Sequence, residues 1–163
     1  IVYTLNLIYN HIIKMEKKNL TAKEIFSLAI ENHKKKEFII AKKYYEEVLV
    51  THNNHFQTHN NLGLIFKELN QLNDALRCFK KAIEIEPTYV VGINNLAQIL
   101  QETNNLKKSA EYYEQSMQLN PNKKETFEGY SKTLFKLGQH FKALELINKA
   151  NGYIRFTKDD YTI

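Results

Sequence analysis

The stretch 60-NNLGLIF-66 returns 34 residues later as 94-NNLAQIL-100, with the paired asparagines, the leucine and a small residue in the same order. Laying the sequence over itself at this shift also places Phe79 on Tyr113 and Pro87 on Pro121. A fixed period of this length is typical of proteins built from stacked repeats. Extending the register in both directions gives four repeats, at residues 22–55, 56–89, 90–123 and 124–157.

Each repeat contains two stretches with apolar residues at helical spacing, separated by a short polar link such as 69-LNQLND-74. A small residue at the eighth place and an alanine at the twentieth, Gly63 and Ala75 in repeat 2, would let the two helices approach closely. Prolines such as Pro87 end the second helix, because proline lacks an amide donor and clashes with the preceding turn. The sequence therefore predicts one helix hairpin per repeat. Thr21 with Glu24 predicts the capping box at which the first hairpin begins.

On these residues the chain resembles the tetratricopeptide repeats, whose pattern is an aromatic or apolar residue followed by Leu-Gly, Tyr, Ala, Phe and Pro. The resemblance covers residues 22 to about 157 and is best in repeat 2. In repeat 3, Ser109 and Ser116 replace the usual alanines, and we expect them to weaken the local packing. The resemblance implies an all-α fold, a right-handed superhelical solenoid of antiparallel helix hairpins with a concave inner face. It also implies a protein-interaction scaffold.

The concave face would be lined by the first helices, on the side opposite the Leu-Gly stripe. Asparagine and glutamine dominate the centre of this predicted groove, and their amides match the hydrogen-bonding groups of an extended peptide backbone. Each such bond nets only about 1 kcal/mol, so the affinity would be modest. The candidate peptide-binding residues are Gln57, Asn60, Asn61, Leu64, Lys67, Asn94, Asn95, Gln98, Gln101 and Lys132.

Asparagine at the sixth place resembles the asparagine ladder of the repeats in O-linked N-acetylglucosamine transferase. The ladder would be short, because Ser27 and Gly129 occupy this place in the outer repeats. The alternative interpretation is compositional, since asparagine pairs also occur at 53–54 and 104–105. Phe26 and Ile30 stand where the chaperone-binding members carry the lysine and asparagine of a carboxylate clamp, so we do not expect binding of chaperone tails.

Composition argues against several other classes of function. The net charge of +5 comes from lysines interspersed with glutamates, which is typical of solvated helix faces and not of a nucleic-acid site. A single cysteine, Cys78, cannot form an internal disulfide, so we expect a reducing compartment and take the cytoplasm as the default. His55 and His59 share helical spacing but lack the carboxylate of a zinc motif, and no phosphate loop or nucleophile elbow is present. We expect no metal, no cofactor and no catalytic residue.

The two ends of the sequence allow several interpretations. Residues 1–21 read as an N-terminal extension in which Met15 is a candidate start, and residues 1–14 are too short and too polar for a membrane anchor. Residues 153–163 alternate apolar and polar around a Lys-Asp-Asp turn, which predicts a β-hairpin opening a downstream domain. An uncapped repeat 4 would favour self-association. The alternative to a free-standing scaffold is the non-catalytic recruiting arm of a longer bacterial enzyme, such as an oxygenase, a sulfotransferase or a glycosyltransferase.

Overall fold

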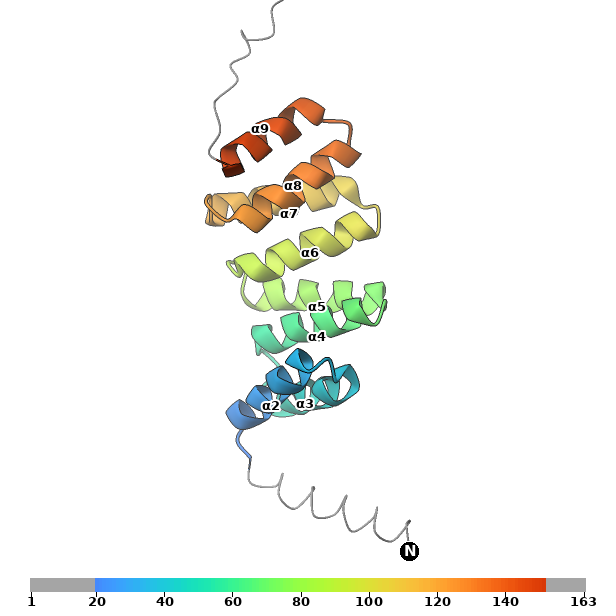
Figure 1. Ribbon diagram of the computed structural model, residues 1–163. Coiled ribbons are helices and arrows are strands. Elements are labelled where there is room, and N and C mark those ends of the chain that lie inside the picture. The colour runs from blue at the N-terminus through green and yellow to red at the C-terminus, as the bar shows by residue number, and fades with distance from the viewer. Residues whose placement is uncertain (1–19, 152–163) are drawn as a thin grey trace, which may run out of the picture. The chain divides into compact units, whose positions relative to one another are not determined.

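Residues 20–151, the part that the computed structural model describes, form eight helices and no strand (Figure 1). The all-α prediction is therefore confirmed for these residues. Residues 1–19 of the predicted extension at 1–21, with Met15, and the predicted β-hairpin at 153–163 lie outside the described residues. In chain order the helices are α2 (Ala22–Lys34), α3 (Phe38–Thr51), α4 (Phe56–Glu68), α5 (Leu72–Ile85), α6 (Val90–Glu102), α7 (Leu106–Leu119), α8 (Lys124–Lys136) and α9 (His140–Asn151).

The helices keep the period read from the sequence. First helices begin at Ala22, Phe56, Val90 and Lys124, which are 34 residues apart and are the first residues of the four predicted repeats. None of the helices between residues 20 and 151 has the length and apolarity that crossing a membrane would need. The chain divides into two bodies, residues 1–58 and 59–163, with the division inside α4. Each body is described separately.

Each first helix ends in the same way, through one residue in the left-handed region. These residues are Lys36, Asn70, Asn104 and Gly138, with φ between 57° and 75°. In the second hairpin, for example, the Gln71 amide donates to the Phe66 carbonyl and the Asn70 amide to the Lys67 carbonyl. These two hydrogen bonds form a Schellman motif, which satisfies the last carbonyls of the helix and reverses the chain.

In the first body, α2 and α3 meet at fully buried small residues, Ala29 and Ala41. Because these side chains are short, the helices approach closely enough for the Tyr45 ring to be enclosed between them. The Phe26 and Tyr45 ring centroids lie 5.8 Å apart, and those of His33 and Tyr45 lie 6.2 Å apart. Small residues and one enclosed aromatic ring therefore make the hairpin core.

The second body repeats this arrangement from hairpin to hairpin. A Cβ atom added to Gly63 would lie 2.5 Å from Phe79 Cε1, so α4 and α5 are in close contact at this glycine. Two hydrophobic clusters follow along the chain. One contains the buried residues Ala75, Phe79, Leu96, Ile99 and Leu100. The other contains Ala97, Tyr113, Phe127, Tyr130, Leu134, Ala143 and Leu146. Tyr112 packs against both, so the core continues from one hairpin to the next.

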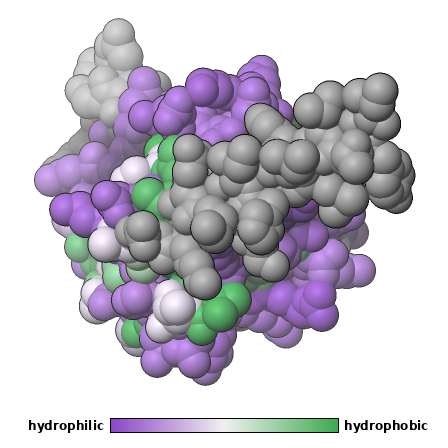
Figure 2. All heavy atoms as spheres, turned by 90° about the horizontal axis from the view of Figure 1, so that it is seen from below, coloured by the Kyte–Doolittle hydropathy of each residue, from purple (hydrophilic) through white to green (hydrophobic). Residues whose placement is uncertain are grey.

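The charged side chains cover the helices as the interspersed sequence pattern indicates. Glu31 pairs with Lys35 at 2.7 Å, and Lys81 pairs with Glu84 at 2.9 Å, each pair within one helix. Such exposed pairs contribute little to stability and keep the surface hydrated. Figure 2 shows one face of the molecule, on which most of the described side chains are hydrophilic.

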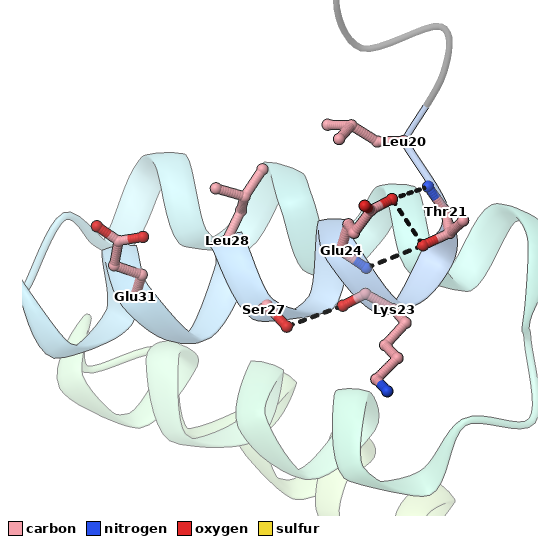
Figure 3. A pocket seen from close by; sticks show the side chains of 7 residues that line it. All are labelled: Leu20, Thr21, Lys23, Glu24, Ser27, Leu28 and Glu31. Carbon is pink, nitrogen blue, oxygen red and sulfur yellow. Dashed lines mark hydrogen bonds between the residues drawn. The ribbon is translucent and has the colours of Figure 1, made fainter.

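Helix α2 begins at the predicted capping box (Figure 3). The Glu24 amide donates to Thr21 Oγ1 at 3.3 Å, while the Thr21 amide and hydroxyl donate to Glu24 Oε2 at 2.7 and 2.8 Å. The backbone hydrogen bond, and after it the side-chain hydrogen bond, lower the pKa of Glu24 below its ordinary value of 4.5. Both bonds favour the charged carboxylate.

Replacing Thr21 by valine should raise the pKa of Glu24 towards 4.5 without reaching it, because the amide of residue 21 still donates. A carboxyl group whose pKa is lowered by folding stabilises the fold above its unfolded pKa, and this contribution is lost as the pH falls through the folded pKa. The variant should therefore show a smaller loss of stability on acidification below pH 4.5. NMR titration of the Glu24 carboxyl carbon and thermal melts at several pH values measure the two effects. An unchanged Glu24 pKa would contradict the assignment.

Candidate functional site

The first helices of the second body lie next to one another, and polar side chains join them. Helices α6 and α8 are in contact, and the Asn95 Nδ2 atom of α6 donates to Asn60 Oδ1 of α4 at 2.8 Å. Asn60 is only 2% exposed. Its own Nδ2 atom points to Asn61 Oδ1 at 3.4 Å. The asparagine pairs that head these helices therefore link one repeat to the next.

A second polar chain runs between α6, α8 and α7. Asn94 Nδ2 donates to Thr126 Oγ1 at 2.7 Å, and Thr126 Oγ1 lies 3.2 Å from Ser116 Oγ. Thr126 and Ser116 are both fully buried. Asn94 Oδ1 is shielded from solvent and has no hydrogen-bond partner among the described residues. The Asn94 amide is therefore directed into the protein and not towards a ligand.

A third chain repeats the second one two turns further along. Gln101 Nε2 donates to Thr133 Oγ1 at 2.7 Å and to the Gly129 carbonyl at 3.3 Å. Thr133 Oγ1 lies 3.2 Å from Ser109 Oγ, which donates to the Ala97 carbonyl at 2.7 Å. The hydroxyls of Thr133 and Ser109 are both hydrogen-bonded although their side chains are fully buried.

We call these six side chains the polar junction. It consists of Asn94 and Gln101 on α6, Ser109 and Ser116 on α7, and Thr126 and Thr133 on α8. The two members on each helix are seven residues apart, so they lie two turns apart on one face. Sequence reasoning treated the two serines as local defects. The structure gives each a hydrogen-bonding partner on the next repeat, and the shared seven-residue spacing is the signal that would have found them.

The predicted groove residues fall into two groups. Asn60, Asn94, Asn95 and Gln101 make the contacts between first helices that are described above. Asn61, Leu64, Lys67 and Gln98 stay partly exposed on α4 and α6, and Lys132 is exposed on α8. Gln57 lies in the first body, near the start of α4, and is also partly exposed.

Two members of the partly exposed group, Lys67 and Gln98, interact with Glu102. Lys67 Nζ lies 3.3 Å from Glu102 Oε1, so this pair joins α4 and α6. Gln98 Nε2 donates to the same Glu102 oxygen at 3.1 Å. We call Asn61, Leu64, Lys67, Asn95, Gln98 and Glu102 the first-helix face. This face offers a cation, an anion, amides and one apolar side chain within two neighbouring helices.

Gly129 explains why the asparagine ladder stops at repeat 4. A Cβ atom at this position would lie 2.4 Å from the Tyr113 ring and its hydroxyl oxygen. Tyr113 is buried and stacks on Tyr130 at 6.2 Å, so its ring cannot easily move. Burial, and after it the charge of Glu102, raises the pKa of Tyr113 to about 12, so the phenol is neutral at physiological pH. The sixth place is filled here by the tyrosine ring instead of an amide.

Within residues 20–151, no group of three or more His, Cys, Asp or Glu side chains is placed to hold a metal ion. The His55 ring packs edge-on against Phe26 at 4.8 Å, and its Nδ1 lies 2.7 Å from Thr58 Oγ1. His55 is therefore engaged in local packing at the start of α4.

Comparisons with known proteins agree with this architecture. Residues 56–89 match a family model described as tetratricopeptide repeat, and residues 78–111 match a second model with the same description. A solved structure described as the crystal structure of MamA has a TM-score of 0.78 at 15% identity, covering 88% of this chain and 83% of that chain. A second, MamA from residue 41 to its end from Desulfovibrio magneticus RS-1, has a TM-score of 0.75 at 16% identity, covering 83% and 76%. No curated protein matches this chain in sequence.

Replacing Gly129 by alanine should destabilise the protein although alanine is the better helix former. The helix propensity gained is about 1 kcal/mol, while forcing a methyl group against an enclosed ring costs about 1–3 kcal/mol. We expect a net cost of about 1 kcal/mol in urea unfolding. In a Tyr113→Leu background the ring atoms are gone, so the same glycine substitution should become stabilising. A stabilising effect in both backgrounds would show that the ring does not restrict this position.

Replacing Ser109 by alanine tests the polar junction against the repeat pattern. The family pattern has alanine at this place and predicts a neutral or stabilising change. The observed hydrogen bonds predict a loss of about 1–2 kcal/mol, because the Ala97 carbonyl and Thr133 hydroxyl lose a buried partner. Thr133→Val should reduce the stability less in the Ser109→Ala background than in the unsubstituted protein, because the two hydroxyls are coupled. A double-mutant cycle by chemical unfolding measures both values, and strict additivity would contradict the network.

Proposed function

Because this chain is a tetratricopeptide-repeat protein, we propose that it is a protein-interaction scaffold and that its first-helix face binds an extended peptide or a partner helix. The fold and the family support a role in protein–protein interaction. The finer assignment, to this face and this kind of ligand, is our inference. The observation that supports this assignment is the Lys67–Glu102 ion pair, because the pair joins two first helices and remains partly exposed.

The polar junction limits which side chains are available to recognise a peptide. Asn94 and Gln101 hold α8, so they are not available for a peptide backbone without breaking a contact between repeats. Recognition therefore depends on Lys67 and Glu102 for charge, on Leu64 for apolar contact, and on Asn61 and Gln98 for further hydrogen bonds. A ligand with both an acidic and a basic side chain would exchange with the existing ion pair at little cost, since partly exposed pairs are weak.

The experiment begins with peptides selected from a random library on the full chain. The exchange variant Lys67→Glu with Glu102→Lys keeps the ion pair and the net charge but reverses its direction. We expect it to weaken the selected peptides about tenfold or more, because both charged groups of the ligand then meet like charges. Isothermal titration calorimetry measures the affinities.

A matched control is available on α5, where Lys81 and Glu84 form another exposed pair at 2.9 Å. Exchanging these two residues should leave the affinity unchanged. The pair of substitutions Asn61→Ala and Asn95→Ala tests the amides in the same assay. If the selected peptides bind equally well to the α4–α6 exchange and to the double alanine variant, the first-helix face is not the binding site.

A further inference from the structure

The last hairpin of the described residues carries a hollow between α8 and α9. It has a volume of about 300 Å³ and is separate from the Lys67–Glu102 pair. The hollow is lined by Lys124, Phe127, Glu128, Ser131, Lys132, Phe135 and Ile147. Six of these residues come from the first helix of repeat 4 and one from its second helix.

The same surface exists one repeat earlier, and there it is occupied. Subtracting 34 from each lining residue gives Val90, Ile93, Asn94, Ala97, Gln98, Gln101 and Tyr113. This is the surface on which α8 docks, since Asn94 and Gln101 donate hydrogen bonds to α8. Ala97 and Tyr113 also share one buried cluster with Phe127 and Tyr130 of α8. The hollow therefore has the form of a surface that receives a helix.

Large apolar side chains are exposed on α8 and α9, the two helices that form the hollow. Leu144 is 49% exposed, whereas its counterparts Ala110 and Leu76 pack against the two core clusters. Phe135 is 37% exposed and stands where Gln101 stands in repeat 3. A helix seated here would cover both side chains and gain the hydrophobic free energy of their burial.

A second copy of the chain is a poor occupant if it docks through its own α2. At the places where α8 carries the fully buried Thr126 and Thr133, α2 carries Glu24 and Glu31. Figure 3 shows both carboxylates among the residues that line the open side of α2. At these two places the carboxylates would face Glu128 and Phe135 and not Lys132. Burial would take Glu24 out of water with no cation opposite it and would remove the water around the exposed Glu31–Lys35 pair.

The charges of the hollow indicate which helix would fit. Glu128 lies 3.8 Å from Lys124, so the two largely compensate each other. Lys132 is exposed and makes no hydrogen bond or ion pair with any described residue. A helix with an apolar face for Phe135 and Leu144 and an acidic flank for Lys132 would be complementary in shape and charge.

We propose that the hollow at repeat 4 binds an amphipathic helix of a partner protein, with an acidic residue placed against Lys132. This site lies on repeat 4, the last hairpin of the described residues, and does not depend on the first-helix face. It would give the scaffold a second, independent point of attachment.

The probe is a fluorescein-labelled peptide of about 16 residues, long enough to form a helix once bound, with leucines on one face and glutamates along the flank. A matched peptide carries lysines in place of the glutamates. Fluorescence anisotropy on the full chain should show binding of the acidic peptide and about two- to fivefold weaker binding of the basic one. Phe135→Ser should weaken the acidic peptide about tenfold, with circular dichroism as the check on folding.

Charge variants make the test specific. Lys132→Glu should reverse the preference, so that the basic peptide binds better than the acidic one. Lys107 is another exposed lysine, on α7. Lys107→Glu should change nothing, and neither should the Lys67–Glu102 exchange. Equal binding of both peptides, or binding that ignores Phe135 and Lys132, would overturn the proposal.

Two further results would assign the hollow to another occupant, and each would also overturn the proposal that a partner helix binds there. If the acidic peptide binds only after residues 152–163 are deleted, that segment of the chain occupies the hollow. If sedimentation velocity shows a dimer of the full chain that Phe135→Ser dissociates, a second copy occupies it.

Discussion

The close approach of paired helices at buried small residues is the contact on which the rest of the structure depends. Ala29 with Ala41, and Gly63 with Ala75, are examples in which neither side chain keeps the helices apart. This short distance encloses the aromatic ring at the twenty-fourth place, Tyr45 in repeat 1 and Phe79 in repeat 2. A larger side chain at any of these places would separate the hairpin and displace the ring beneath it.

The periodic part of the fold could be predicted because it follows from spacing. The helix starts, the small residues and the capping box at Thr21 all obey local rules of helix formation. The hairpin turns were less visible, since the left-handed residue is a lysine at position 36 and an asparagine at 70 and 104. Only position 138 carries the glycine that a sequence rule would look for among these four turns.

The candidate site could be predicted only in part, because a side chain's partner is not encoded by its place in the repeat. The quoted asparagines were expected to face a ligand, yet Asn60 and Asn94 are directed towards the neighbouring repeat. The family pattern has alanine at the place of Ser109, so the serine was expected only to weaken the packing. The sequence of one repeat does not reveal that Thr133 lies beside it. Contacts between repeats join residues between 10 and 35 positions apart, so no fixed spacing identifies them before the fold is known.

The seven-residue spacing of the polar junction also bears on how this chain could have evolved. Duplicating a repeat is the simplest way to lengthen a solenoid, but the neighbours in this chain are not interchangeable. If a copy of repeat 3 stood in place of repeat 4, Gly92 and Ile99 would face Ser116 and Ser109 where threonines now stand. Both buried hydroxyls would lose a partner. The buried hydrogen bonds therefore make repeats 3 and 4 specific for each other. A new copy of either repeat would need compensating substitutions on both sides of its junction.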